Sequence, residues 1–119
     1  LTPYGGSGGG HHVHMKSAYK SEPKYNPKKA LCLSNDEMKR LGIDHDLVSA
    51  EQRRLCEELK KSGKPMTREE QNRIAVQALQ AGGASEQMAR DIVARSQWNL
   101  KEKGIRHPTD MPWGKKDGK

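Results

Sequence analysis

The chain has 119 residues, of which 32% are hydrophobic and 31% charged, with no Phe and a net charge of +7. This composition predicts one domain with a thin core of Leu, Ile, Val, Met and Ala, and its charge favours a polyanionic ligand or an acidic protein partner, although a basic surface can also serve solubility alone. No stretch reaches the roughly 18 apolar residues of a membrane span and no signal segment opens the chain, so we expect no membrane partner, and any export would depend on another part of a larger polypeptide.

Residues 1–34 are rich in Gly, Pro and Lys and predict a mostly irregular segment with two short strands, over 12–18 and 30–33. The loop between them contains X-Pro pairs, which disfavour helix. The glycine-rich run GGSGGG lacks the context of a phosphate-binding loop and predicts a flexible lead-in to the first strand. Cys32 and Cys56 lack C-x-x-C spacing and predict small core residues without a disulfide.

From Ser34 onward the pattern predicts four helices, each with a polar residue at its start and glycine at its end. They are expected to begin at Ser34, Ser49, Thr67 and Ser85 and to end at Gly42, Gly63, Gly82 and Gly104. Apolar residues recur at helical spacing within them, so each helix can bury one face. The acidic pairs Glu57-Glu58 and Glu69-Glu70 are interpreted as solvated helix faces.

The expected fold class is therefore α+β, in a single domain over 1–119. A loop and strand part covers 1–34, a helical part 35–104, and a polar tail 105–119 is expected to wrap the surface, held by Trp113. His107, in this tail, is interpreted as structural.

The segment His11-His12-Val13-His14 concentrates groups that bind metal ions and transfer protons. On a strand, His12 and His14 would share one face while His11 points to the other. A cloning remnant, with a glycine-serine spacer and a histidine tag, could account for the first two histidines. It would not account for His14 or for the apolar and basic residues that follow, so we favour a functional site.

Cleavage of a phosphodiester needs a base near neutral pKa, a divalent cation and cationic groups that position the backbone. Adjacent histidines at a strand end could supply the base and a cation ligand. The helix that begins at Asn35 could supply a further ligand, and Asn26 could orient the base through its side-chain amide or a backbone carbonyl.

The segments GGGHHVHMKSAYK, YNPKKALCLSNDEMKRLGIDH and SAEQ resemble the GHH-signature nuclease toxin domains of the HNH/endonuclease VII superfamily, which occur at the C-termini of Rhs and other polymorphic toxin proteins. The resemblance extends from about Pro3 to the PWG near Trp113. It implies a small His-metal finger (ββα-metal) nuclease core with additional C-terminal helices. It also implies a metal-dependent endonuclease that acts on DNA, delivery by a specialised secretion system into the cytoplasm of a target cell, a larger Rhs-like carrier polypeptide, and a cognate immunity protein, which charge complementarity predicts to be acidic.

Carried over residue by residue, the resemblance makes His12 the general base and His11 a cation ligand. The intervals from His12 to Asn26 and Asn35 are close to those of the orienting Asn and the helix-borne ligand in colicin-type HNH enzymes, with His45 as the competitor of Asn35. The full HNH pattern carries a histidine pair on the helix, which this chain lacks. The expected cofactor is a divalent ion, Mg²⁺ first, with Mn²⁺ or Zn²⁺ as alternatives. One or two imidazoles with an amide oxygen and waters suit Mg²⁺ or Mn²⁺ better than a closed structural Zn²⁺ site does.

Substrate contacts are expected from basic and polar residues around the histidines, namely Lys16, Ser17, Lys20, Lys28 and Lys29. His14 could touch substrate or support His12, or could be a partly exposed strand histidine. His45 could be a ligand, a residue that supports a ligand, or a loop histidine. Two other functions remain open: an RNase of the same fold, and a non-catalytic basic module that binds nucleic acid or a protein partner.

Overall fold

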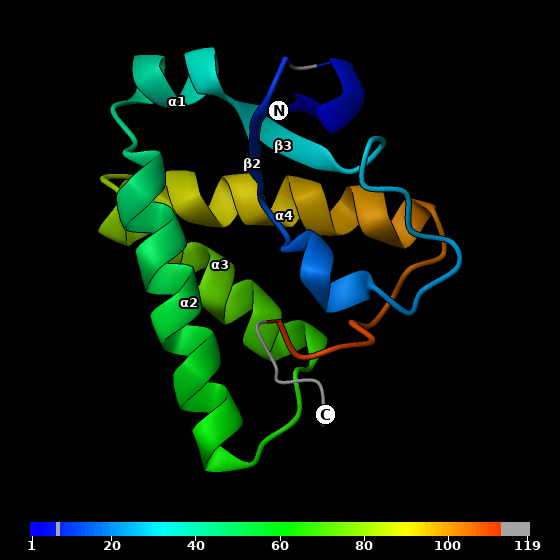
Figure 1. Ribbon diagram of the computed structural model, residues 1–119. Coiled ribbons are helices and arrows are strands. Elements are labelled where there is room, and N and C mark those ends of the chain that lie inside the picture. The colour runs from blue at the N-terminus through cyan, green and yellow to red at the C-terminus, as the bar shows by residue number, and fades with distance from the viewer. Residues whose placement is uncertain (7, 113–119) are drawn as a thin grey trace.

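The computed structural model describes residues 1–6 and 8–112, and within them the chain forms a small α+β fold (Figure 1). Three short strands, β1 (Thr2–Pro3), β2 (Gly10–His12) and β3 (Leu31–Ser34), form an antiparallel sheet in the order β1-β3-β2. Four α-helices follow, which are α1 (Asn35–Leu41), α2 (His45–Ser62), α3 (Arg68–Ala81) and α4 (Glu86–Glu102). The predicted α+β class is confirmed at this level.

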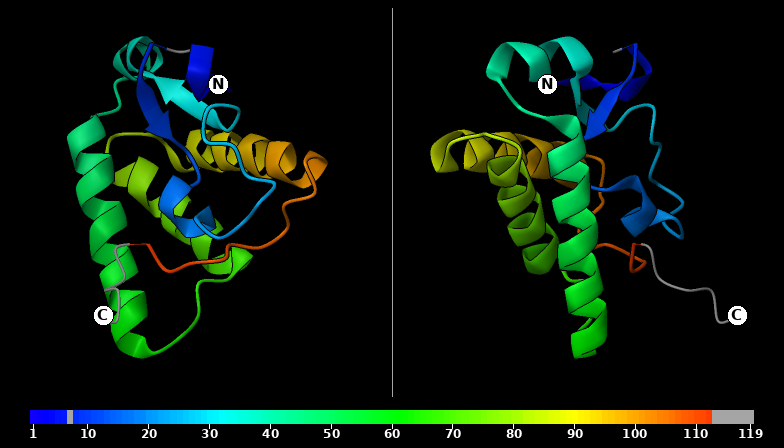
Figure 2. Two further views of the ribbon diagram at one scale, coloured as in Figure 1. Left: turned by 45° about the vertical axis from the view of Figure 1, so that its right-hand side comes forward. Right: turned by 60° about the vertical axis from the view of Figure 1, so that its left-hand side comes forward.

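The sheet lies at one end of the molecule, beside α1 and against α4, while α2 packs along α3 (Figures 1 and 2). The main core lies between these elements. Val13 and Leu33 come from the strand side, Val48 from α2, and Leu79 and Val93 from α3 and α4. The buried apolar residues on α2, α3 and α4 recur at three- and four-residue spacing, as the sequence predicts for helices with one buried face.

Three of the four predicted helix starts are confirmed. Ser34 forms a capping box with Glu37, and the hydroxyls of Thr67 and Ser85 accept hydrogen bonds from backbone amides in the first turns of α3 and α4. The predicted start at Ser49 is wrong, because the carboxylate of Asp44 caps α2 by accepting from the amides of Asp46 and Leu47. The earlier start puts His45 in the first turn of α2.

The predicted strand over 12–18 is also wrong beyond His12. The chain leaves the sheet there and forms a 3₁₀ turn over Lys16–Tyr19. Val13, His14 and Met15 are all buried, so the alternation of buried and exposed side chains that defines a half-buried strand does not continue. The second strand was predicted one residue too early, over 30–33.

The described part of the tail wraps the surface as expected. Ile105 is buried, and the amides of Thr109 and Asp110 donate to the carbonyl of Ala18. The expectation for Trp113 lies outside the described residues. Both cysteines are buried and free, which confirms their interpretation as core residues.

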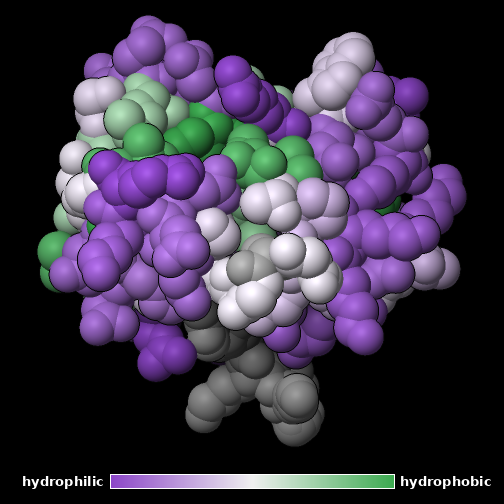
Figure 3. Space-filling view, turned by 90° about the horizontal axis from the view of Figure 1, so that it is seen from above, coloured by the Kyte–Doolittle hydropathy of each residue, from purple (hydrophilic) through white to green (hydrophobic). Residues whose placement is uncertain are grey.

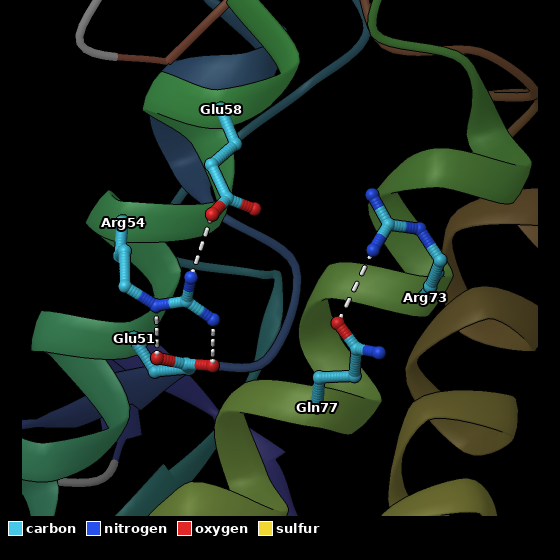
Figure 4. A network of polar contacts seen from close by, with 5 residues as sticks. All are labelled: Glu51, Arg54, Glu58, Arg73 and Gln77. Atoms are coloured by element: carbon cyan, nitrogen blue, oxygen red, sulfur yellow. Dashed lines mark hydrogen bonds and ion pairs between the residues drawn. The ribbon is translucent and has the colours of Figure 1, made fainter.

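The solvent faces of α2 and α3 carry helical ion pairs. Arg54 bridges Glu51 and Glu58, with N–O distances of 2.7 Å, and Arg73 binds Gln77 (Figure 4). Arg73 also forms an ion pair with Glu70. This supports the interpretation of the acidic pairs as solvated faces. Seen from above, hydrophobic surface lies between hydrophilic side chains at the sheet end of the molecule (Figure 3). No helix in the described part of the chain is long and apolar enough to cross a membrane.

Gly10 is required where β2 pairs with β3. A Cβ added at Gly10 would overlap the carbonyl oxygen of Leu33 and lie 2.9 Å from the Cα of Ser34, and both neighbours are backbone atoms that cannot turn aside. We expect Gly10→Ala to destabilise the fold by about 1–3 kcal/mol, measured by urea unfolding. Gly6→Ala is the control, because a Cβ there meets no atom within 4 Å. Equal stabilities of the two variants would contradict this reading.

Candidate active site

Three histidines meet at an open cleft of about 350 Å³. His11 and His12 come from the end of β2, and His45 comes from the first turn of α2. The 3₁₀ turn that follows β2 closes the cleft on another side. The full lining consists of Tyr4, Gly10, His11, His12, Met15, Lys16, Ser17, His45 and Gln52. The structure therefore brings together the predicted base, two of the predicted ligands and two of the predicted substrate contacts.

The ring of His12 is held on two sides. Its Nε2 lies 2.9 Å from the carbonyl oxygen of Pro27, and its ring stacks on Tyr4 with the centroids 4.4 Å apart. Because a carbonyl can only accept, Nε2 carries the proton, and the neutral ring then keeps Nδ1 as an unprotonated acceptor. Burial lowers the pKa of His12, the hydrogen bond to Pro27 opposes this effect, and the charge of Lys16 adds to it. The ring is therefore a base that stays neutral at physiological pH.

The carbonyl that orients His12 belongs to Pro27, one residue after the predicted Asn26. Asn26 builds the turn instead, because its side-chain oxygen accepts from the amide of Lys28 and its carbonyl accepts from the amides of Lys29 and Ala30. Asn26 thus acts on the base indirectly, by fixing the loop that presents Pro27.

His11 is almost fully buried and faces His45. The two ring centroids are 5.3 Å apart in an edge-to-face arrangement, and the Nε2 of His11 lies 3.3 Å from the side-chain nitrogen of Gln52. Burial lowers the pKa of His11 to about 4, with smaller contributions from His45 and His12. His11 is therefore neutral, as a metal ligand must be. Because the Gln52 nitrogen can only donate, Nε2 of His11 accepts from it, and an ion would bind this nitrogen by displacing that hydrogen bond.

The donor set that faces the cleft is imidazole from His11 and His45. Within residues 1–6 and 8–112, no group of three or more His, Cys, Asp or Glu side chains is placed to hold a metal ion. Asn35, the other predicted ligand, is exposed at the start of α1 beside Gly9 and does not line the cleft. Two imidazoles fit an ion that keeps most of its coordination sites for water or substrate, and they do not fit a closed structural site, which needs four protein ligands.

His14 does not belong to the cleft, and its description as a partly exposed strand histidine is wrong. Its side chain is buried, with Nδ1 2.6 Å from the hydroxyl of Ser96 on α4 and Nε2 2.7 Å from the side-chain oxygen of Asn72 on α3. The Asn72 oxygen can only accept, so Nε2–H donates and Nδ1 accepts from Ser96. His14 therefore ties the end of the β2 segment to two helices and has no surface for a substrate.

The predicted lysine contacts divide into two groups. Lys16 and Ser17 line the cleft, and Lys20 lines a second cavity next to it. Lys28 and Lys29 are exposed on the far part of the loop and line neither cavity, and the carbonyl of Lys29 accepts a hydrogen bond from Lys103. Of these residues, Lys16 and Ser17 line the same cleft as His12.

Sequence reasoning missed Tyr4, Gln52 and Pro27. Gln52 left a signal, because it occupies the buried stripe of α2 between Val48 and Leu55, where an apolar residue is expected. Tyr4 and Pro27 left no such signal. The stacking of Tyr4 on His12 and the hydrogen bond that the Pro27 carbonyl accepts from His12 depend on the paths of loops, which sequence spacing does not determine.

No protein-family model, no curated protein and no solved structure matches this chain.

Proposed function

We propose that the chain is a metal-dependent endonuclease with His12 as its general base. The observation that carries the proposal is the hydrogen bond from His12 Nε2 to the carbonyl of Pro27, which leaves Nδ1 as a neutral acceptor beside the two imidazoles of His11 and His45. A base alone would fit many hydrolases. The adjoining basic residues, the overall charge of +7 and the motif resemblance favour a phosphodiester in nucleic acid.

The residues of the cleft divide the chemistry between them. His12 takes a proton from a water molecule as the oxygen of that water attacks phosphorus, and the bond from phosphorus to the leaving oxygen breaks. Lys16, at the rim, attracts the phosphate and offsets its charge. Tyr4 and Pro27 hold the base ring in position throughout. A divalent ion held by His11 and His45 would neutralise the charge that develops on the phosphate and the leaving oxygen.

The donor set bears on the choice of ion. The sequence favoured Mg²⁺ or Mn²⁺ on the assumption that the Asn35 amide oxygen takes part. With Asn35 outside the cleft, two imidazoles remain, and imidazole suits Zn²⁺ or Ni²⁺ better than Mg²⁺. We infer that a transition-metal ion supports activity at lower concentration than Mg²⁺ does.

The test is cleavage of supercoiled plasmid and of single-stranded RNA by the purified protein, with Mg²⁺, Mn²⁺, Ni²⁺ or Zn²⁺ and with EDTA. We expect cutting that EDTA abolishes, and His45→Ala should raise the ion concentration needed for half-maximal rate by about 10–100-fold. His107→Ala is the matched control, because His107 is exposed in the tail. Cutting that persists in EDTA would overturn the metal dependence. Failure to cut either nucleic acid with any ion would overturn the nuclease and leave the non-catalytic binding module.

We extend the proposal to a toxin role on the motif resemblance alone. In this reading the domain is delivered by a secretion system as part of a larger Rhs-like polypeptide and acts in the cytoplasm of the target cell. A cognate immunity protein, acidic to match the charge of +7, neutralises it. Growth arrest on cytoplasmic expression, relieved by the neighbouring gene product, would support this role.

A further inference from the structure

A second cavity of about 300 Å³ adjoins the histidine cleft. Lys16 and Ser17 line both cavities. Pro27, whose carbonyl contacts His12, lines the second cavity. A ligand that spans both cavities would therefore pass directly beside the proposed base. Nothing in the proposed cleavage step uses this second cavity.

Two stacked tyrosines give the cavity its aromatic character. The rings of Tyr19 and Tyr25 lie 4.9 Å apart and 18° from parallel, and Tyr19 is anchored by a 2.5 Å hydrogen bond from its hydroxyl to Gln71. Both tyrosines line the cavity, and Tyr25 is half-buried there together with Pro27. Its ring is thus held as a fixed apolar surface.

Polar groups complete the cavity. The hydroxyl of Tyr25 is buried and has no hydrogen-bond partner among the described residues. A buried polar group without a partner is unfavourable, and a ligand that bonds to this hydroxyl would remove the penalty. Lys16 and Lys20 supply positive charge, and Glu22 supplies a carboxylate. One oxygen of Glu22 accepts from the amide of Lys24, and a carboxylate has further lone pairs to offer.

We propose that this cavity is a subsite for one nucleobase of the substrate, adjacent to the phosphate that is cut. The proposal rests on the proposed nuclease function, because it places the phosphate of the same nucleotide in the histidine cleft. The base packs on Tyr25 and Pro27, and Lys16 and Lys20 bind its phosphate. Since a paired base cannot enter such a cavity, the substrate is single-stranded or locally opened nucleic acid.

Glu22 gives the subsite a preference among bases. A carboxylate accepts from the two N–H groups of an exocyclic amino group, as on cytosine, whereas thymine offers it one N3–H between two carbonyl oxygens that repel it. The subsite therefore favours a base that carries an amino group over thymine.

The experiment is an NMR titration of the metal-free protein with deoxycytidine monophosphate, thymidine monophosphate and 2-deoxyribose 5-phosphate. All three carry the same phosphate, and the last lacks a base. We expect deoxycytidine monophosphate to bind at least about tenfold more tightly than the sugar phosphate and to shift the ring signals of Tyr25. Tyr25→Leu, checked for folding by circular dichroism, should remove most of this advantage, and Glu22→Gln should equalise the two nucleotides.

If the wild type binds deoxycytidine monophosphate and the sugar phosphate equally well, the subsite proposal is overturned. This outcome does not depend on how any variant behaves. Equal binding of the two nucleotides by the wild type would overturn the role of Glu22. The titration needs no metal ion and no cleavage, so its outcome is separate from that of the nuclease assay. Base-dependent binding by a protein that cuts nothing would overturn the proposed function and leave the subsite standing.

Discussion

His12→Ala is expected to reduce metal-supported cleavage of nucleic acid by about 10²–10⁴-fold while the domain stays folded. The ring is half-buried at the edge of the cleft, where it contacts Tyr4 and Pro27, and it is not part of the main core. Its loss removes the ring whose Nε2–H donates to the Pro27 carbonyl and whose Nδ1 is left as an acceptor. The measurement is the single-turnover rate on a labelled oligonucleotide, with circular dichroism as the check on folding.

The same experiment has a pH signature. Because the pKa of His12 is lowered, the wild-type rate should stay high through neutral pH and fall only in acid, where the ring takes up a proton and can no longer accept one. His107→Ala serves as the control and should match the wild type. A folded His12→Ala protein that retains more than about a tenth of the rate would remove His12 from the role of base.

His14→Ala is expected to lower the free energy of unfolding by about 2–4 kcal/mol. The substitution opens a cavity and leaves Ser96 and Asn72 without their partner between β2, α3 and α4. Urea unfolding at neutral pH measures the effect. His45→Ala is the matched control, since His45 is exposed and should change stability little.

Burial lowers the pKa of both His14 and His11 to about 4, against 6.5 for an ordinary histidine. Above pH 6.5 neither the folded nor the unfolded chain protonates these rings, so their contribution to stability is complete. As the pH falls from 6.5 to 4, these rings bind protons in the unfolded chain but not in the folded chain. The free energy of unfolding therefore falls by about 1.4 kcal/mol per pH unit for each ring. Between pH 6.5 and 4, His14→Ala should therefore show a slope smaller than that of the wild type in EDTA by about 1.4 kcal/mol per pH unit, and an unchanged slope would contradict the assignment.

Local sequence signals predicted most of the helical part of the fold. The caps at Ser34, Thr67 and Ser85 act within one turn, so their effect can be read from neighbouring residues. The start of α2 was missed because Asp44 and Ser49 are both good capping residues, and burial of Val48 decides in favour of the earlier one. The strand over 12–18 was predicted wrongly, because the burial of three consecutive residues, Val13, His14 and Met15, is a tertiary effect.

The candidate site was predictable in part. The histidine cluster pointed to His11 and His12 from residue type alone, and the structure places both at the cleft together with His45, the proposed alternative to Asn35. Their roles as base and ligands stay predictions. The predictions for Asn35 and His14 failed for the same reason. They took the positions of the side chains from sequence spacing, as if the strand and the helix kept the directions that the sequence suggested. Where the chain turns after His12, His14 is carried into the interior, and α1 directs Asn35 away from the cleft.

The site is assembled from separate stretches of chain. His12 finds its carbonyl 15 residues later, in the loop that precedes β3, and His11 finds Gln52 41 residues later, so the second pairing exists only once α2 has docked beside the sheet. An extended chain, such as one threaded through a narrow channel, holds its histidines without their partners and is chemically inert. Under the proposed function, cleavage would begin only after folding is complete, so the rate of folding would set when it starts.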